Sequence, residues 1–232
     1  MLVSVEDGQF NAYVVRPAQP VAPVIVVIQE IFGVNADLRA TCNELAGHGF
    51  IAVAPDLFWR DAPGLDLNAL NEAEWARGLE LYQKYDFDRG VRDIAATITA
   101  ARQLEGSTGK IGVTGFCLGG LMTFLTAARI GVDAAVEYYG GGTDQYLNEA
   151  DGITGPLMLH LGEEDEFISK AAQADIKNAL AGKPNVTVHS YPGCSHAFAR
   201  HNGFHFDAEA AAIANERTRI FFDRYLRDQP AA

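Results

Sequence analysis

The central stretch of the chain reads Lys110-Ile111-Gly112-Val113-Thr114-Gly115-Phe116-Cys117-Leu118-Gly119-Gly120. Its apolar part, residues 110–114, predicts a short buried strand, and residues 118–130 have the spacing of a helix. Cys117 therefore falls where a strand becomes a helix, with glycines two positions away on either side. Glycine is needed at those positions because the backbone of such a turn is strained and crowds its neighbours. The pattern predicts a nucleophile elbow with cysteine in place of the usual serine; a buried packing cysteine is the alternative.

Strand-like and helix-like segments alternate on both sides of this stretch. With 232 residues and 48% hydrophobic content, the chain is long enough for one substantial core. The alternation predicts a single α/β domain over residues 1–232, with a mostly parallel sheet and helices on both faces. Residues 1–15 suit an antiparallel hairpin at the sheet edge. The further strands are predicted at 24–28, 50–54, 134–139, 157–161 and 186–191, and the further helices at 38–46, 88–104 and 213–221.

A thiol nucleophile needs a base, and the base needs an acid that orients it. Asp165 follows the predicted strand 157–161, and His196 follows the last predicted strand in a glycine-containing loop. The order nucleophile, acid, histidine, each just after a strand, is that of α/β-hydrolases. Two alternatives stay open. The acid could instead come from the adjoining glutamates, and His196 could be an ordinary loop histidine. The adjoining glutamates are Glu163, Glu164 and Glu166.

The elbow also predicts where an oxyanion would be stabilised. One hydrogen-bond donor is the N–H of Leu118, directly after the nucleophile. The second is expected from the loop after strand 24–28, where Ile31 is the candidate. Glu30 precedes it in that loop and is unexpected, because an ionised carboxylate there would repel the intermediate. Glu30 must either point elsewhere or handle a proton.

Composition excludes several other classes of protein. A formal net charge of -12 and the lack of a Lys/Arg cluster disfavour nucleic-acid binding. No apolar run approaches the roughly 20 residues that cross a bilayer, so no membrane partner is expected. The three cysteines have no metal-ligand spacing, and neither a metal nor another cofactor is expected. The N-terminus lacks an export signal pattern, so a cytoplasmic location is the expectation.

These residues together resemble the dienelactone hydrolases, also called carboxymethylenebutenolidases. The resemblance spans nearly the whole chain, and in order its landmarks are Gln29 to Asn35, Ala54 to Leu57, Gly115 to Gly120, Tyr138 to Gly140, Gly162 to Asp165, His196 to Arg200 and Ala214 to Thr218. It implies a triad of Cys117, Asp165 and His196. It further implies that Glu30 contacts the resting thiol and takes its proton, and that Arg200 binds a substrate carboxylate.

The same resemblance implies the substrate and the pocket. The substrate would be a small anionic enol-lactone, the pocket would include Phe32 and Tyr138, and the protein would be a monomer. The family usually has a second carboxylate-binding arginine in the excursion at residues 58–85, but Trp75 stands at that position here. Arg77 is the candidate replacement, although it lies roughly 200° away around a helix.

The excursion at residues 58–85 is therefore either a pocket wall or a surface helix without a part in binding. Two other functions also stay open. One is a broader carboxylesterase on the same fold. The other is a non-catalytic ligand-binding or redox-sensing relative.

Overall fold

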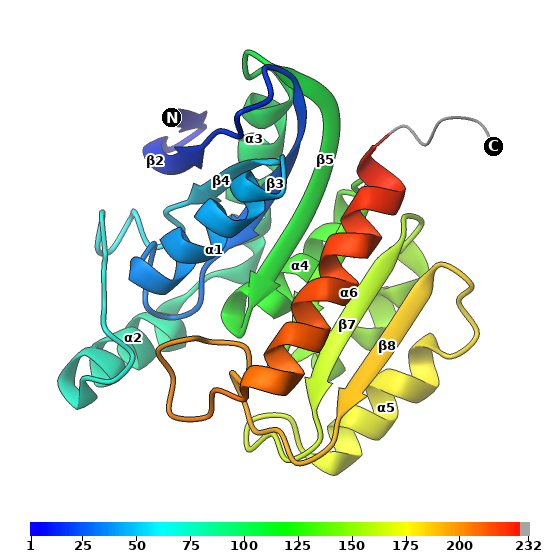
Figure 1. Cartoon of the computed structure of the whole chain (residues 1–232). Helices are drawn as coiled ribbons and strands as arrows, with labels where there is room; N and C mark the ends of the chain where they lie inside the picture. Colours follow the sequence, from blue (N-terminus) through cyan, green and yellow to red (C-terminus); the bar gives the residue numbers. More distant parts are fainter. Residues whose placement is uncertain (228–232) are drawn as a thin grey trace.

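The computed structural model describes residues 1–227 and contains one eight-stranded sheet (Figure 1). The strands lie in the order β1-β2-β4-β3-β5-β6-β7-β8; β1 and β2 are antiparallel to their neighbours, and β3 to β8 are parallel. The predicted single-domain α/β fold and its N-terminal hairpin are confirmed. Residues 228–232 of the predicted domain lie outside the described residues. The bounds are β1 Leu2–Val5, β2 Gly8–Val15, β3 Ala22–Ile28, β4 Ile51–Pro55, β5 Ser107–Phe116, β6 Ala134–Tyr138, β7 Leu157–Gly162 and β8 Val186–Tyr191.

Helices cover both faces of this sheet (Figure 1). On one face lie α1 (Ala36–Gly47) and α6 (Ala208–Leu226), where Phe222 of α6 packs edge-on against Phe50 at 6.3 Å between ring centroids. On the other lie α3 (Phe87–Arg102), α4 (Leu118–Arg129) and α5 (Lys170–Leu180), with the 3-10 segment η1 (Thr143–Gly152) packed between α4 and α5. The excursion contains α2 (Glu72–Lys84). None of the helices described within residues 1–227 combines the length and apolar character needed to cross a bilayer.

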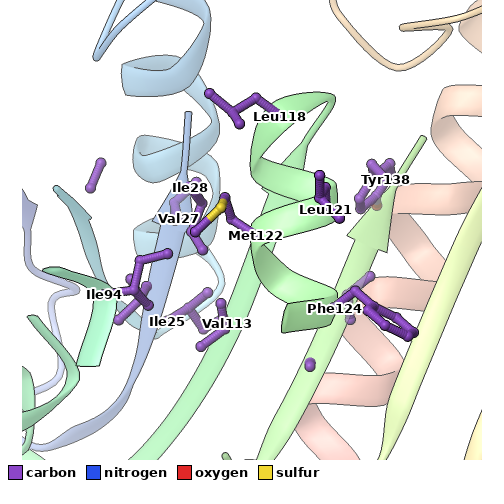
Figure 2. Packing of buried hydrophobic residues seen from close by; sticks show 14 of the residues in the cluster. Ile25, Val27, Ile28, Ile94, Val113, Leu118, Leu121, Met122, Phe124 and Tyr138 are labelled. Atoms are coloured by element: carbon purple, nitrogen blue, oxygen red, sulfur yellow. The ribbon is translucent and has the colours of Figure 1, made fainter. Parts of the chain in front are cut away.

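The sheet centre is apolar on both faces because it is covered on both faces. Every residue of β3 is buried, as expected for a strand inside a parallel sheet. Figure 2 shows Leu121, Met122 and Phe124 of α4 in the same cluster as side chains of β3 and β5. This rigid centre holds the carboxyl ends of the strands, which in Figure 1 point downward for β5, β7 and β8.

Two elements had no counterpart among the predicted segments. Helix α5 begins at the N-cap Ser169, whose hydroxyl accepts a hydrogen bond from the N–H of Ala172 at 3.2 Å. Its buried face consists of Gln173, Ile176 and Leu180, so only two large apolar residues mark it in the sequence. The 3-10 segment η1 has still less periodic signal, since its buried residues are Thr143 and Ala150.

The junction of β5 and α4 is packed backbone against backbone. A Cβ atom at Gly115 would lie 2.0 Å from the carbonyl oxygen of Gly119, and one at Gly119 would lie 2.3 Å from the carbonyl oxygen of Ile28. A Cβ atom at Gly120 would lie 2.5 Å from the carbonyl oxygen of Tyr138. Distances this short are not possible for real side chains, so the glycines bring the start of α4 against β3 and β6.

We expect Gly119→Ala to destabilise the protein by about 1–3 kcal/mol, because the new methyl group meets backbone that can move only with β3. The matched control is Gly182→Ala, where an added Cβ meets nothing within 4 Å and the change should be within about 0.5 kcal/mol. Urea unfolding of both variants measures the difference. Equal effects would contradict the proposed close packing.

Candidate active site

Cys117 occupies a strained backbone position at the start of α4. Its φ is 57° and its ψ is -115°, a conformation that costs a non-glycine residue about 1–3 kcal/mol. Its N–H donates to the carbonyl oxygen of Tyr138 at 3.1 Å, and its side chain, half-buried, lines a cleft. Tyr139 and Ala197 are the other non-glycine residues with positive φ in the described chain. The tyrosine ring packs on His196 and Ala197 lines the same cleft, so the backbone strain is concentrated at this site.

His196 and Asp165 form a buried pair at the ends of β7 and β8. The Nδ1 atom of His196 lies 2.9 Å from Oδ2 of Asp165, and Oδ1 of Asp165 accepts hydrogen bonds from the backbone N–H groups of Phe167 and Ile168 at 2.8 and 3.1 Å. Because the carboxylate can only accept, it holds a proton on Nδ1, so Nε2 is the ring atom that gains or loses the second proton. The Nε2 atom is buried and has no hydrogen-bond partner among the described residues.

The electrostatic environment of His196 favours its charged form. Burial by itself would lower the pKa, but the nearby Cys117 and the hydrogen bond and charge of Asp165 outweigh burial and raise the pKa of His196 to about 10. Cys117 raises this pKa mainly through the charge that its sulfur carries when it is ionised. Once Cys117 has lost its proton, the imidazolium form of His196 is therefore favoured.

The backbone N–H groups of Ile31 and Leu118 both belong to residues that line the cleft. The loop after β3 and the start of α4 are held together by the close approach at Gly119, where a Cβ atom would also lie 2.7 Å from the carbonyl oxygen of Gln29. Helix α2 packs on the same loop: a Cβ atom at Gly78 would lie 2.6 Å from the carbonyl oxygen of Ile31. Both residues thus belong to closely packed backbone that lines the cleft, and their role as oxyanion donors stays a prediction.

Glu30 and Arg200 form an ion pair beneath the cleft. The Nε atom of Arg200 lies 2.7 Å from Oε2 of Glu30, and the side chains are 12% and 9% exposed. The Nη2–H group of Arg200 donates a hydrogen bond to Oε1 of Glu30 at 3.2 Å. The Nε atom of Arg200 is close to Glu30 but makes no hydrogen bond. The guanidinium also lies over the ring of Phe32, 5.0 Å from its centroid. No hydrogen bond joins Glu30 to Cys117 among the described residues, and the expected contact of Glu30 with the thiol stays a prediction.

The cleft itself has a volume of about 580 Å³ and lies at the carboxyl ends of the strands, the usual ligand position in an α/β sheet. Of the predicted residues it brings together Cys117, His196, Arg200, Phe32 and the two amide donors. Its remaining lining residues are Ala69, Leu70, Glu72, Trp75, Leu79, Tyr82, Gly141, Glu166, Phe167, Ala197, Gly203, Phe204 and His205. The excursion is therefore a pocket wall rather than a surface helix without contact to the site.

Two predicted substrate-binding residues lie outside the cleft. Arg77 is on the far side of α2, with its side chain 41% exposed and its Nη1 atom 2.6 Å from Glu80, because helical periodicity turns it away from Trp75. Tyr138 points to the α6 face of the sheet, where its hydroxyl bonds to Thr218 at 2.6 Å and Asn215 at 3.0 Å. Tyr138 contributes its carbonyl group to the elbow but no side chain to the cleft. Both assignments are corrected.

Comparison with known proteins agrees with this architecture. A model of the dienelactone hydrolase family matches residues 10–226. The chain belongs to this dienelactone hydrolase family. A "Carboxymethylenebutenolidase" of Pseudomonas putida is 42% identical over 216 residues, covering 93% of this chain and 92% of the relative. A "Putative carboxymethylenebutenolidase" of Azospirillum brasilense is 43% identical over 222 residues, covering 95% of this chain and 96% of the relative.

A solved structure supports the same conclusion. The crystal structure of a "Putative Dienelactone Hydrolase" from Klebsiella pneumoniae subsp. pneumoniae MGH 78578 aligns with a TM-score of 0.84 at 26% identity, covering 97% of this chain and 98% of that one. The resemblance seen in the sequence, the α/β-hydrolase fold and the expectation of an ester hydrolase are confirmed.

Most residues of the apolar cleft wall in this dienelactone hydrolase family member were not predicted from the sequence. Trp75, Leu79 and Tyr82 have i, i+4, i+7 spacing on α2, a signal that was available in the sequence. Phe167 and Phe204 come from loops, where no periodicity exists, and their side chains remain 56% and 82% exposed. Phe167 lies 4.8 Å from His196 between ring centroids.

We expect Cys117→Ser to lower the pKa of His196 from about 10, because the variant removes the sulfur, whose charge when ionised and whose hydrogen bond favour the imidazolium form. An NMR pH titration of the ring protons of His196 measures the change. Cys42→Ala is the matched control, since Cys42 is buried in α1 and outside the cleft, and it should leave the titration unchanged. A His196 titration that is the same with and without the thiol would refute the assigned cause.

Proposed function

We propose that this chain hydrolyses an enol-lactone that carries a carboxylate, such as dienelactone (4-carboxymethylenebut-2-en-4-olide), to 4-oxohex-2-enedioate. The observation that carries the proposal is the cleft itself. Cys117 and His196 share it with Arg200, the one arginine or lysine among its lining residues in the described chain. A nucleophile, a base and a single cation on one apolar cleft fit an activated ester with one negative charge. The relatives named carboxymethylenebutenolidase support the same substrate class.

The first step of the proposed reaction begins at the ion pair of Glu30 and Arg200. A substrate carboxylate competes for the guanidinium, which binds carboxylates through two parallel hydrogen bonds. Glu30 then loses its partner and can accept the proton of the Cys117 thiol. A thiol that stays neutral until substrate arrives is protected from oxidation and alkylation, because the thiolate is the reactive form.

The chemical steps follow from the triad geometry. The sulfur of Cys117 attacks the lactone carbonyl, and the oxyanion is stabilised by the N–H groups of Ile31 and Leu118. The intermediate collapses, the ring C–O bond breaks and the enolate leaves, to be protonated within the substrate or by His196. Water then attacks the thioester while His196, oriented by Asp165, accepts its proton. The C–S bond breaks, the acid is released, and the Cys117 thiolate takes back the proton held by Glu30.

A cysteine nucleophile restricts the substrate. Thiolates attack carbonyl groups readily but are also good leaving groups, so a tetrahedral intermediate with a poor alkoxide leaving group returns to reactants. An enolate is a better leaving group than an alkoxide. We therefore expect enol-lactones and activated esters to be turned over and ordinary alkyl esters and amides to be poor substrates. A broader carboxylesterase is the second candidate, favoured by the largely apolar lining of the cleft.

Cys117→Ala should reduce kcat/KM for dienelactone at least about 1,000-fold, since the residues of a triad act as a unit. Turnover is followed by the loss of the dienelactone absorbance. Cys42→Ala should keep wild-type turnover. Wild-type activity in purified Cys117→Ala would exclude the mechanism.

Arg200→Ala should raise KM for dienelactone on the order of 100-fold more than KM for a neutral nitrophenyl ester, because it removes a charge-assisted carboxylate contact. Structural damage from leaving Glu30 unpaired affects both substrates, so the ratio isolates carboxylate binding. Arg77→Ala, an exposed arginine on the far side of α2, is the matched control and should change neither KM. Equal effects of Arg200→Ala on the two substrates would favour the broader carboxylesterase.

A further inference from the structure

One wall of the cleft is apolar and carries no cation. Trp75, Leu79 and Tyr82 line the cleft from α2, and all three are packed partly buried against the core. Their i, i+4, i+7 spacing places them on one face of the helix. Phe167 and Phe204, with Leu70, continue this apolar surface from the surrounding loops.

The roll of α2 about its axis is fixed by close packing. Gly78 lies on the inward face, where a Cβ atom would be 2.6 Å from the carbonyl oxygen of Ile31 and 3.2 Å from the Ile31 side chain. The helix cannot rotate to bring Arg77 inward without pushing another residue into that backbone. Arg77 is also held outside by Glu80, which is bonded to Lys84 as well. The wall therefore remains without a positive charge.

Apart from His196 of the triad and His205, whose Nδ1 lies 3.4 Å from Oε1 of Glu166, the other titratable residues of the cleft with a charge are acidic. Glu72 at the start of α2 and Glu166 next to Asp165 both line it. Glu166 is held in place because one of its oxygens accepts the N–H of His196 at 3.1 Å. The one arginine of the cleft, Arg200, is already paired with Glu30. A first substrate carboxylate can displace Glu30, but a second one on the α2 wall would meet either apolar side chains or the like charge of Glu72.

We propose that the cleft selects monoanionic substrates, with one carboxylate on Arg200 and an alkyl or aryl substituent against Trp75, Leu79 and Tyr82, and that it rejects a second carboxylate. This substrate class rests on the proposed function and makes it more specific. Each methylene group buried on such a wall strengthens binding about fourfold. A carboxylate buried there without a partner is disfavoured, because nothing replaces its lost hydration.

The test measures binding, so that it does not depend on turnover. Calorimetric titration of the wild type with heptanoate and heptanedioate compares two acids of equal length that differ in one terminal carboxylate. Heptanoate should bind at least about 10-fold more tightly, and more tightly than butanoate by about fourfold per methylene. Heptanedioate binding as tightly as heptanoate would overturn the proposal.

Three variants assign the effect to the wall. Trp75→Arg should reverse the preference, because it places a cation where the second carboxylate would lie. Leu79→Ala should weaken heptanoate binding several-fold with little change for heptanedioate, and it provides a second test if Trp75→Arg folds poorly. Arg77→Ala is the control for charge on α2 and should change neither affinity. An unchanged preference in both Trp75→Arg and Leu79→Ala would overturn the assignment.

Turnover of dienelactone, measured beside the titrations, separates the two proposals. Dienelactone turnover without a preference for heptanoate overturns the monoanionic selectivity and leaves the proposed reaction standing. A preference for heptanoate that Trp75→Arg reverses, in an enzyme that does not hydrolyse dienelactone, supports the apolar wall and overturns the reaction. With both observed, a dienelactone bearing a ring propyl group should have a higher kcat/KM than one bearing a ring carboxylate.

Discussion

The site depends on one packing constraint: three pieces of backbone meet at the start of α4 with no side chains between them. Gly119 brings the helix against the end of β3, and Gly120 brings it against β6. This contact holds Cys117 in its strained conformation and sets the amides of Ile31 and Leu118 beside it. The strained conformation persists because the close packing around it leaves the backbone no room to relax.

Two buried pairs of side chains in and beside the cleft interact electrostatically. The charge of Cys117, when its sulfur is ionised, and the hydrogen bond and charge of Asp165 raise the pKa of His196. Glu30 and Arg200 neutralise each other in a buried ion pair. Both pairs are buried, so the stability of each charged group depends strongly on its partner, because water no longer solvates it. In the proposed function, the same burial would let a protein with a net charge of -12 bind an anion through one arginine.

The residues that could be predicted were those tied to strand ends. Asp165 and His196 were found because the carboxyl ends of parallel strands converge, so chain order and strand position were enough. Tyr138 was misassigned because it is the last residue of β6, where alternation turns its side chain to α6. Helix α5 was missed because its buried face contains a glutamine and only two large apolar residues.

The sequence by itself determined the fold and the strand-to-helix turn at Cys117, because apolar periodicity and glycine spacing are local signals of backbone geometry. Chain order and strand position also placed Asp165 beside His196. Only the tertiary structure decided what faces the substrate. The roll of α2 is set by the contact between Gly78 and Ile31, residues far apart in the chain, and it turns Trp75 into the cleft and Arg77 out of it. The pairing of Glu30 with Arg200 likewise joins residues 170 positions apart, a distance over which no sequence period carries information.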